Sequence, residues 1–448
     1  MTHHVRRLIL SFALVFGNGV LAQTWQTLSN VPVLTRYNDV YFVTAKLGWI
    51  VNGSGQIYRT VDGGASWQKQ FDESRAHFRS IGFLDAQHGW AGNVGPGEFG
   101  ATDSTTLYHT QDGGQTWQPR NSFIGPKPRG LCGMHVVNDS VICAVGRVRG
   151  PAFFARTIDR GATWRAQDMS AYAAGLIDVY FFHPDTGIAV GLTNVTHNNS
   201  SGVILYTTTG GQTWEKRFTT TRVGEWCWKI SFPSHHVGYA SLQRNSATPI
   251  YILKTTDGGK TWQEKLFSSS YYFVQGLGFV DERNGWIGGN SSFPSYQTKD
   301  GGATWQSAGF GASMNRVRFL GDTLGYAVGR TVYKYTRPAT QVAAHAHETP
   351  GAFELAQNYP NPISARGLAN AGTTIHFNLR QRSTVTIKVF DVIGREITQL
   401  LHEAREAGEH VARWDAADRE GNAVRPGIYF YSVRADDFTA TRKMIVME

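Results

Sequence analysis

Five aspartates that recur along the chain are the first candidates for acid–base chemistry. Each is the third residue of the phrase Thr-x-Asp-x-Gly-x-(Ser/Thr)-Trp, and the closing tryptophans stand 43 to 50 residues apart. Two carboxylates that cleave a glycosidic bond must lie within about 5–10 Å of each other. One aspartate per repeat separates the carboxylates, whereas an aspartate in a tight turn accepts backbone N–H groups. The fourth copy of the phrase has Thr209 in place of aspartate. We predict a structural role for Asp62, Trp67, Asp112, Trp117, Asp159, Trp164, Trp214, Asp257, Trp262, Asp300 and Trp305.

A second set of residues combines arginines with amides and aromatic rings and could bind an anionic ligand. Its members lie in segments that lead into short apolar strands, which could gather them at one end of a strand assembly. Guanidinium groups bind carboxylates in bidentate fashion, and aromatic rings anchor ligands. A sugar acid or a peptide would suit such a surface, and a solvated lining without a ligand is the plainer interpretation. Arg75 and Tyr172 lie in the same kind of segment. The predicted binding residues are Arg36, Asn38, Arg79, Arg129, Arg222, Trp228, Tyr271, Tyr272, Gln275, Asn315 and Arg316.

The histidines and cysteines predict neither a metal centre nor a nucleophile. His235-His236 and the pair His345 and His347 lack the further ligands that a zinc site needs. No phosphate-binding loop, zinc-protease or nucleophile-elbow phrase occurs, so we expect no cofactor, no metal and no catalytic residue. The remaining candidates are three cysteines, which we interpret as small buried apolar residues, with one disulfide left open: Cys132, Cys143 and Cys227.

Repetition predicts the elements that position these residues. Between copies of the aspartate phrase lie an apolar strand, a polar turn and a glycine–aromatic pair that begins another strand, as in Val40–Phe42 followed by Gly48-Trp49. Each unit therefore supplies about four short strands, the content of a propeller blade. Seven units can be counted, one of them degraded. We predict an all-β chain: a seven-bladed β-propeller over residues 23–336, followed by a small β-sandwich domain.

The two ends of the repeat region predict how the ring closes. The seventh unit has three strands, ending near Thr331–Tyr335, and no tryptophan phrase follows it. The sequence Thr24-Trp25-Gln26-Thr27 resembles the missing fourth strand. We expect Trp25 to complete the last blade, because this closure hides two sheet edges that would otherwise invite aggregation.

The repeats resemble Asp boxes, the bacterial-neuraminidase-type repeats of sialidases, sortilins and xyloglucan-active hydrolases. The blade length and the glycine–tryptophan phrase are most similar to the photosystem II assembly and stability factor family of seven-bladed propellers. The resemblance covers roughly residues 23–337 and implies a fold rather than a function. It implies two further possibilities: an envelope assembly or scaffold factor, or a secreted glycoside hydrolase.

A sialidase would need an arginine cluster and a tyrosine–glutamate nucleophile pair. Arg36, Arg79, Arg222, Tyr271 and Glu225 could supply these groups, but the family's Phe-Arg-Ile-Pro phrase is missing and seven blades replace six. A xyloglucan-type hydrolase generally uses a cleft between two propellers, and one propeller is predicted here. We therefore favour a protein that is not an enzyme.

The chain ends predict export. Arg6 and Arg7 precede a short apolar stretch and then Val20-Leu21-Ala22, which is typical of a secretory signal peptide over residues 1–22. No other stretch is long and apolar enough to cross a bilayer, so we expect no transmembrane span in the mature chain. Residues 337–351 break the repeat and read as a linker before a β-sandwich at residues 352–448.

The last domain resembles the type A C-terminal sorting domain of the type IX secretion system. The resemblance rests on QNYPNP (357–362), VFDVIGREI (389–397), AGEH (407–410), PGIYFYSV (426–433) and TRKMIV (441–446). It implies that the secretion machinery is a partner and that the protein is secreted or held at the outer cell surface. It also implies a bacterium of the Bacteroidetes and related phyla, in which a photosystem role would be out of place.

Composition narrows the remaining function classes. The net charge is +9, from 43 basic and 34 acidic residues, yet no run of five or six like charges occurs. A nucleic-acid partner is therefore not expected. The sequence predicts a secreted or cell-surface propeller that binds a glycan or a protein.

Overall fold

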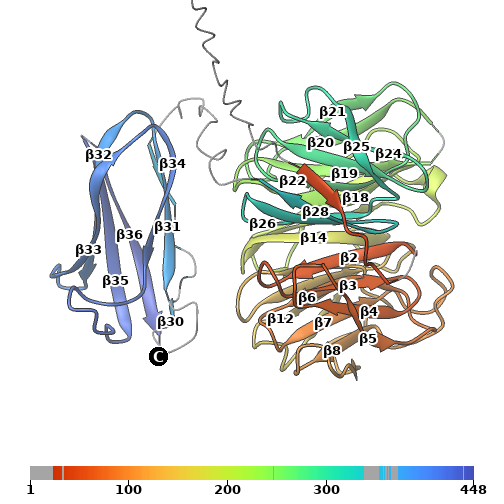
Figure 1. Ribbon diagram of the computed structural model, residues 1–448, viewed down its shortest axis with the longest axis horizontal. Coiled ribbons are helices and arrows are strands. Elements are labelled where there is room, and N and C mark those ends of the chain that lie inside the picture. The colour runs from red at the N-terminus through yellow and green to blue at the C-terminus, as the bar shows by residue number, and fades with distance from the viewer. Residues whose placement is uncertain are drawn as a thin grey trace, which may run out of the picture. The chain divides into compact units, whose positions relative to one another are not determined.

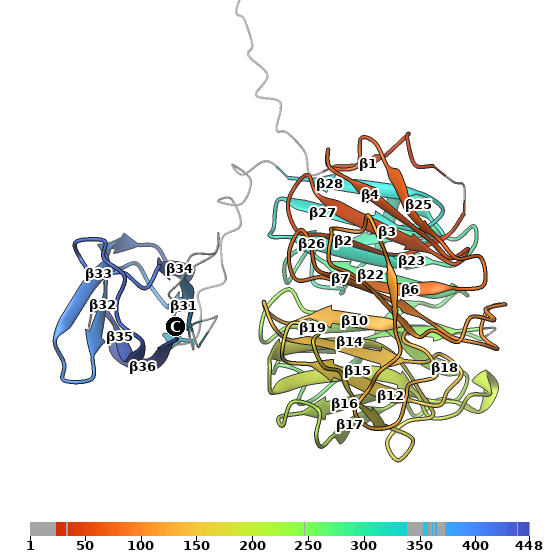
Figure 2. The same ribbon diagram turned by 90° about the horizontal axis from the view of Figure 1, so that it is seen from below.

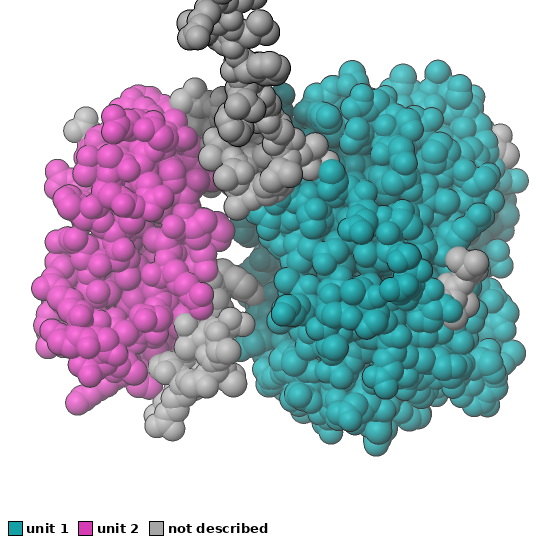
Figure 3. Space-filling view, in the orientation of Figure 1, with its two compact units in different colours: residues 1–339 teal, residues 340–448 magenta. Residues whose placement is uncertain are grey.

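The structure is a computed structural model that describes residues 24–337 except 33–34 and 246, and residues 353–447 except 357, 359–360, 362, 365–371 and 437. The chain divides into two compact units, Met1–Ala339 and Thr340–Glu448 (Figure 3). The predicted signal peptide (1–22), most of the predicted linker (337–351) and part of the QNYPNP phrase lie outside the described residues.

Seven antiparallel sheets of four strands each make up the described part of the first unit (Figure 1). Blades 1 to 3 are β2 (Tyr37–Phe42), β3 (Gly48–Asn52), β4 (Gln56–Thr60), β5 (Gln68–Asp72); β6 (Phe78–Phe83), β7 (Gly89–Asn93), β8 (Leu107–Thr110), β9 (Gln118–Arg120); and β10 (Gly133–Val136), β11 (Ile142–Gly146), β12 (Phe153–Thr157), β13 (Arg165–Asp168). Blades 4 and 5 are β14 (Gly175–His183), β15 (Thr186–Leu192), β16 (Gly202–Thr207), β17 (Glu215–Thr219); and β18 (Glu225–Ser231), β19 (Gly238–Arg244), β20 (Ile250–Thr255), β21 (Gln263–Ser268). Blades 6 and 7 are β22 (Val274–Phe279), β23 (Gly285–Gly289), β24 (Pro294–Thr298), β25 (Gln306–Ala312); and β26 (Arg316–Leu320), β27 (Leu324–Val328), β28 (Val332–Thr336), β1 (Thr24–Thr27).

The first strands of the blades line a central channel. Each inner strand contacts the next, and β26 contacts β2, so the seven sheets form a closed ring. This confirms the predicted all-β, seven-bladed propeller. The described residues contain one helix, the short 3-10 turn η1 (His197–Asn199), and none long and apolar enough to span a membrane.

A glycine at or next to the start of the second strand allows close packing within six of the seven blades. A Cβ atom on Gly48 would come within 2.5 Å of the Phe42 ring on the neighbouring strand, and Gly89 faces Phe83 in the same way at 2.3 Å. Any larger side chain would push the ring away. The aromatic residue after the glycine then reaches the next blade: Trp49 stacks on Phe83 with ring centroids 3.5 Å apart. The repeated phrase therefore encodes contacts both within and between blades.

The chain start completes the last blade, as predicted. β1 pairs antiparallel with β28, with Trp25 opposite Tyr335, and the two strands lie side by side (Figures 1 and 2). The Trp25 ring stacks on Phe310 of blade 6 at 4.7 Å between centroids. Residues from the two ends of the propeller thus share one aromatic cluster that holds the ring closed.

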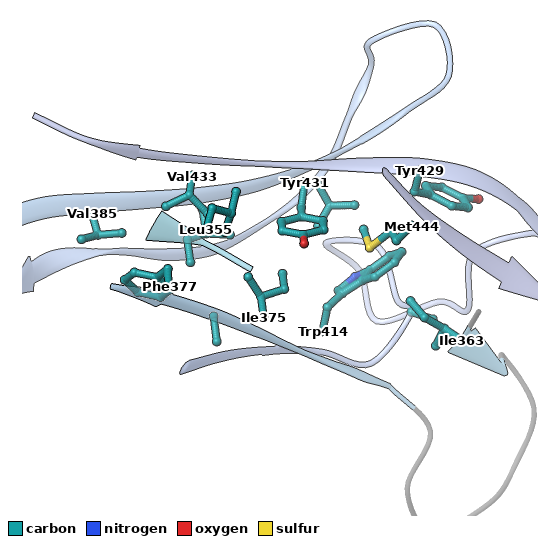
Figure 4. Packing of buried hydrophobic residues seen from close by; sticks show 14 of the residues in the cluster. Leu355, Ile363, Ile375, Phe377, Val385, Trp414, Tyr429, Tyr431, Val433 and Met444 are labelled. Atoms are coloured by element: carbon teal, nitrogen blue, oxygen red, sulfur yellow. The ribbon is translucent and has the colours of Figure 1, made fainter. Parts of the chain in front are cut away.

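The second unit is a β-sandwich of two sheets. One sheet has the order β29 (Glu354–Leu355), β31 (Thr373–Leu379), β34 (Gly408–Trp414), and the other has the order β30 (Ile363–Ser364), β36 (Phe438–Met447), β35 (Gly427–Ala435), β32 (Ser383–Asp391), β33 (Glu396–Arg405). Side chains such as Trp414, Tyr431 and Met444 point toward one another between the sheets and are buried (Figure 4). The domain therefore has its own hydrophobic core.

Candidate functional site

A pocket of about 330 Å³ opens at one end of the propeller channel. Its residues come from the inner strands and the segments that enter them, and from the ends of the second strands and the loops that follow, in blades 1 to 6. Both kinds of segment lie at the same end, because antiparallel strands return the chain there. The lining residues are Arg36, Arg79, Phe99, Val148, Arg149, Val195, His197, Trp226, Trp228, Gln243, Asn245, Phe273, Gln275 and Asn290.

Arg79 is a buried arginine held between two aromatic rings. Its guanidinium carbon lies 5.1 Å from the centre of the Trp228 ring and 5.4 Å from that of Phe99. The side chain is 1% exposed, and its Nε and Nη2 atoms have no hydrogen-bond partner. Burial lowers the pKa of Arg79, with a further contribution from the charge of Arg316. The pocket lining therefore includes a dehydrated guanidinium with two nitrogen atoms that have no partner within the described residues.

Arg36 is oriented by amide side chains. Its Nη2 atom donates to Oε1 of Gln275 and, at 3.0 Å, to Oδ1 of Asn315. The Trp228 indole donates to the same Asn315 oxygen at 3.2 Å. Burial and the nearby charge of Arg79 lower the pKa of Arg36 to about 9, so it stays charged at neutral pH. Two guanidinium groups thus converge on one cavity.

The loop between β7 and β8 brings Phe99 next to Arg79 and Arg149. Phe99 has φ of 47°, a left-handed conformation that is uncommon for a bulky residue, and its ring is 44% exposed. It stacks on His77 at 5.0 Å and lies 5.9 Å from the guanidinium carbon of Arg149. Residues held in sparsely populated backbone regions cluster at active sites and ligand sites.

A layer of buried ion pairs supports the pocket from below. Arg316 donates to both oxygens of Asp178, at 2.7 and 2.9 Å, and its Nε lies 3.2 Å from Asp39. Arg318 donates to both oxygens of Asp39 at 3.0 Å. Burial alone would raise the pKa of Asp178, but the charges of Arg316 and Lys229 outweigh it and lower the value to about 2. These pairs join blades 1, 4 and 7 across the channel.

The structure brings only some of the predicted binding residues together. Arg36, Arg79, Trp228 and Gln275 line the pocket. Others lie directly beside it: Asn315 bonds Arg36, and Asn315 also donates to the Asn38 carbonyl at 2.8 Å. Arg316 belongs to the ion-pair layer rather than to the pocket lining.

The remaining predicted residues lie elsewhere and have other partners. Arg222 pairs with Glu225 and Glu264, each at 2.8 Å, and lies over the ring of Tyr251. The hydroxyl of Tyr271 donates to the Asn245 carbonyl, and that of the buried Tyr272 donates to the Pro294 carbonyl. Arg75 pairs with Glu73, Arg129 is exposed, and Tyr172 packs against the core of blades 3 and 4. None of these lines the pocket.

Sequence reasoning missed the residues contributed by the loops after the second strands. These include Phe99, Arg149 and His197; sequence reasoning also missed Trp226 on the inner strand β18 and Gln243 near the end of the second strand β19. Blade topology contained a usable signal, since every loop from a second to a third strand returns to the end where the inner strand begins. Only the lengths and side chains of the loops decide which of them reach the channel.

In six of the seven blades, the aspartate phrase or its threonine variant forms a turn at the opposite end. Thr60 donates to Asp62 at 2.7 Å, and the backbone N–H and hydroxyl of Ser66 donate to the two Asp62 oxygens at 2.9 and 2.5 Å. The hydrogen bonds from Ser66 and Thr60 lower the pKa of Asp62 to about 2. The turn recurs in the other boxes, and Thr209 accepts the Thr213 N–H in its variant. These carboxylates are therefore occupied by their own turns.

The cysteines and histidines form no reactive cluster in the described residues. Cys132, Cys143 and Cys227 are free and buried, so the disulfide that the sequence left open is not formed. Burial raises the pKa of each thiol. His235 and His236 lie in the exposed turn after β18. Within the described ranges, no three His, Cys, Asp or Glu side chains gather as metal ligands.

These features define a seven-bladed BNR-type propeller with an arginine-lined pocket at one end of its channel. Residues 18–121 match the family described as "Photosynthesis system II assembly factor YCF48", and residues 364–437 match the "FlgD Ig-like domain". The first match agrees with the YCF48-like propeller that the repeats suggested. No curated protein is similar enough to this chain to count as a match.

Solved structures support the same fold. A structure of "YCF48 bound to D1 peptide" is 20% identical, covers 70% of this chain and 97% of its own, and has a TM-score of 0.52. YCF48 from Cyanidioschyzon merolae is 17% identical, with 70% and 98% coverage and a TM-score of 0.53. The GH74 xyloglucanase from Xanthomonas campestris is 14% identical, with 80% and 60% coverage and a TM-score of 0.51. At these identities the likeness concerns the fold alone.

Proposed function

We propose that this protein is a binding protein that holds a carboxylate-bearing segment of a protein partner in the channel-mouth pocket. The observation that carries the proposal is Arg79, a buried guanidinium whose Nε and Nη2 donors have no partner. A carboxylate supplies two acceptor oxygens in the geometry that a guanidinium prefers. Arg36 and Arg149 line the same cavity and add positive charge.

The aromatic residues favour a peptide over a sugar ring. Trp226 and Trp228 line the pocket but are only 6% and 2% exposed, so they offer little open ring face for stacking on a pyranose. Phe99 is the well-exposed ring at the mouth. The related propeller bound to a peptide supports this choice by analogy. A sugar acid remains the second candidate, because its carboxylate would suit the same arginines.

The pocket lining favours binding without catalysis. The described lining residues include no aspartate, glutamate or tyrosine. Glycoside hydrolysis needs two carboxyl groups beside the scissile bond. Tyr271 and Glu225, the pair considered for a sialidase, are committed to Asn245 and to Arg222, respectively. We therefore propose a protein that is not an enzyme.

A binding experiment on the full-length protein tests this function. Three sets of ligands are titrated into the protein while its tryptophan fluorescence is recorded. They are acidic peptides with free C-terminal carboxylates, the same peptides with amidated ends, and oligosaccharides of sialic and galacturonic acid. We expect free-acid peptides to bind at least tenfold more tightly than the amides. Arg36→Gln and Arg149→Gln should weaken binding, whereas Arg129→Gln, an exposed arginine outside the pocket, should not. Equal binding by all variants would refute the proposal.

We further propose that the chain is exported through the type IX secretion system and acts at the outer cell surface or in the medium. The support is the series of sorting-domain phrases, of which those at 389–397, 407–410, 426–433 and 441–446 fall on the strands and turns of the β-sandwich. Expression in a bacterium that has this system, with and without residues 353–448, tests the proposal. Retention of the truncated chain in the periplasm is expected, and surface delivery of both forms would contradict it.

A further inference from the structure

The wall of the pocket that blades 5 and 6 supply is built largely from amide side chains. Gln243 lies near the end of β19 and Asn245 just after it, while Gln275 lies on β22 and Asn290 follows β23. Gln243 and Gln275 are each 4% exposed, whereas Asn245 is exposed. A buried amide is costly unless its polar atoms are paired, so the partners of these groups decide what the wall can bind.

Three of these amides form one hydrogen-bonded chain that starts at Arg36. The Nη2 atom of Arg36 donates to Oε1 of Gln275. Gln275 Nε2 then donates to Gln243 Oε1 at 3.2 Å, and Gln243 Nε2 donates to Asn245 Oδ1 at 3.1 Å. A guanidinium group has no acceptor, so it fixes the direction of the whole chain. The chain therefore ends on the Nδ2 donor of Asn245, which has no partner among the described residues.

The oxygen atoms of the lining side chains are all in use. The described lining residues include no hydroxyl or carboxyl group, and the fourth amide oxygen, that of Asn290, accepts the Ser291 N–H at 2.9 Å. His197 can donate or accept through its imidazole ring. The other unpaired polar atoms of these side chains are nitrogen donors on amides, arginines and Trp226. A ligand of this pocket must therefore bring acceptors.

Glu98 does not supply an acceptor to the pocket. Its side chain is 0% exposed and does not belong to the lining. Its Oε1 atom accepts the Arg149 N–H at 2.8 Å, and its Oε2 atom has no hydrogen-bond partner within the described ranges. Burial raises the pKa of this carboxyl despite the charges of the nearby arginines. The unpaired oxygen is thus enclosed by protein and out of reach of a ligand.

Apolar side chains line the pocket on the side of blades 2 to 4. They are Phe99, Val148 and Val195, which come from loops after second strands. Phe99 and Val195 are each 44% exposed, so they can still gain contacts. In a ring of seven blades, blade 2 stands across the channel from blades 5 and 6. A ligand in the pocket therefore meets apolar groups on one side and amide donors on the other.

We infer that the amide wall makes the pocket selective for a carboxylate with an acyl carbonyl beside it, and that Asn245 is the specificity-determining residue. The inference rests on the proposed function, in which arginines bind the carboxylate. The carbonyl accepts from Asn245 Nδ2, and the side chain between the two groups packs toward Phe99. Gln243 is a positioning residue, because its hydrogen bond orients the Asn245 amide. The ligand class is an N-acylated apolar amino acid, which a peptide presents at its last residue.

Three small ligands separate this inference from the proposed function. N-acetyl-leucine carries both groups, 4-methylpentanoate lacks the acylamino group, and N-acetyl-leucinamide lacks the carboxylate. By calorimetry, the wild type should bind N-acetyl-leucine about tenfold more tightly than 4-methylpentanoate, the effect of a well-placed hydrogen bond. Equal binding of the two acids, with the amide still weaker, would overturn the inference and leave the proposed function intact. Failure of both acids to bind would overturn both.

Variants of the amide wall test which residue recognises the carbonyl. Asn245→Leu removes the donor at similar size and should bind the two acids with nearly equal affinity, and its affinity for 4-methylpentanoate checks that the pocket is folded. Gln243→Met keeps Asn245 but removes the bond that orients it, so about half of the preference should remain on a logarithmic scale. Asn198→Leu, an exposed residue outside the lining, is the matched control and should keep the full preference. A tenfold preference that survives in Asn245→Leu would overturn the inference.

Discussion

Replacing Asp178 with asparagine tests whether the ion pairs across the channel hold the propeller together. Asp178 is 1% exposed and accepts two hydrogen bonds from Arg316, which belongs to the last blade. Asparagine has nearly the same shape and can still accept the Ile230 N–H. The change therefore removes one charge and leaves the Arg316 guanidinium buried with only Asp39 as its counter-ion.

The size of the effect follows from the carboxylate's pKa. A shift from 3.8 to about 2 in the folded state corresponds to about 2–3 kcal/mol, at roughly 1.4 kcal/mol per pKa unit. No discount for solvent screening applies, because the group is buried. Breaking a buried pair from one side typically costs about 3–5 kcal/mol. We expect Asp178→Asn to lower the free energy of unfolding by about 3 kcal/mol.

Urea unfolding followed by tryptophan fluorescence is the assay. Twelve of the 13 tryptophans lie in residues 24–337, so the signal reports on the propeller, with Trp414 the exception. A double-mutant cycle with Arg316→Gln should give a coupling energy of about 2 kcal/mol. Asp185→Asn, in an exposed turn, is the control and should change stability by less than about 0.5 kcal/mol. A loss that small for Asp178→Asn would refute the reasoning.

The same pair predicts a pH dependence. The folded-state pKa of Asp178 lies below its unfolded value, so its contribution to stability is complete above pH 3.8 and is lost as the pH falls toward 2. The difference in free energy of unfolding between wild type and Asp178→Asn should therefore shrink over this range. A difference that stays constant from pH 5 to pH 2 would contradict the pKa shift.

Three further changes test other parts of the fold. Trp25→Ala removes the ring that stacks on Phe310 and should cost about 3 kcal/mol of propeller stability in urea, whereas a loss near zero would mean that β1 does not close the ring. Asp257→Ala removes the turn acceptor of Thr261 and should cost about 1 kcal/mol by the same assay, while Thr209→Asp, which restores the common phrase, should not destabilise. Trp414→Ala should abolish the calorimetric transition of the β-sandwich and leave that of the propeller unchanged, because each unit has its own core; simultaneous loss of both would contradict this.

The propeller was predictable because its sequence signals are local and repeated. Gly48 is required by the Phe42 ring on the adjacent strand, and Asp62 is required by a turn only five residues long, so each signal reports on its own neighbourhood. Closure through Trp25 was predictable for another reason: the seventh unit lacked a strand that the chain start could supply. Neither inference needed the positions of distant residues.

The pocket was only partly predictable because it depends on distances across the ring. Arg36 and Arg222 occupy comparable segments before inner strands, but amide side chains hold Arg36 in the pocket, whereas Glu225 and Glu264 hold Arg222 away from it. Phe99 and Arg149 come from loops whose paths are not repeated between blades. Local sequence patterns do not indicate which of several arginines will form an ion pair with a carboxylate in the folded protein.

The distribution of acceptors explains why the pocket and the channel beneath it differ in chemistry. Arg316 and Arg318 take both channel carboxylates, and this pairing spans blades 1, 4 and 7, so it contributes to the closed ring. Because those acceptors are already paired, Arg79 and Lys229 have nitrogen atoms without a hydrogen-bond partner among the described residues, and Arg79 lines the pocket. The buried pairs that stabilise the ring thereby leave two nitrogen atoms of Arg79 unpaired beside the pocket.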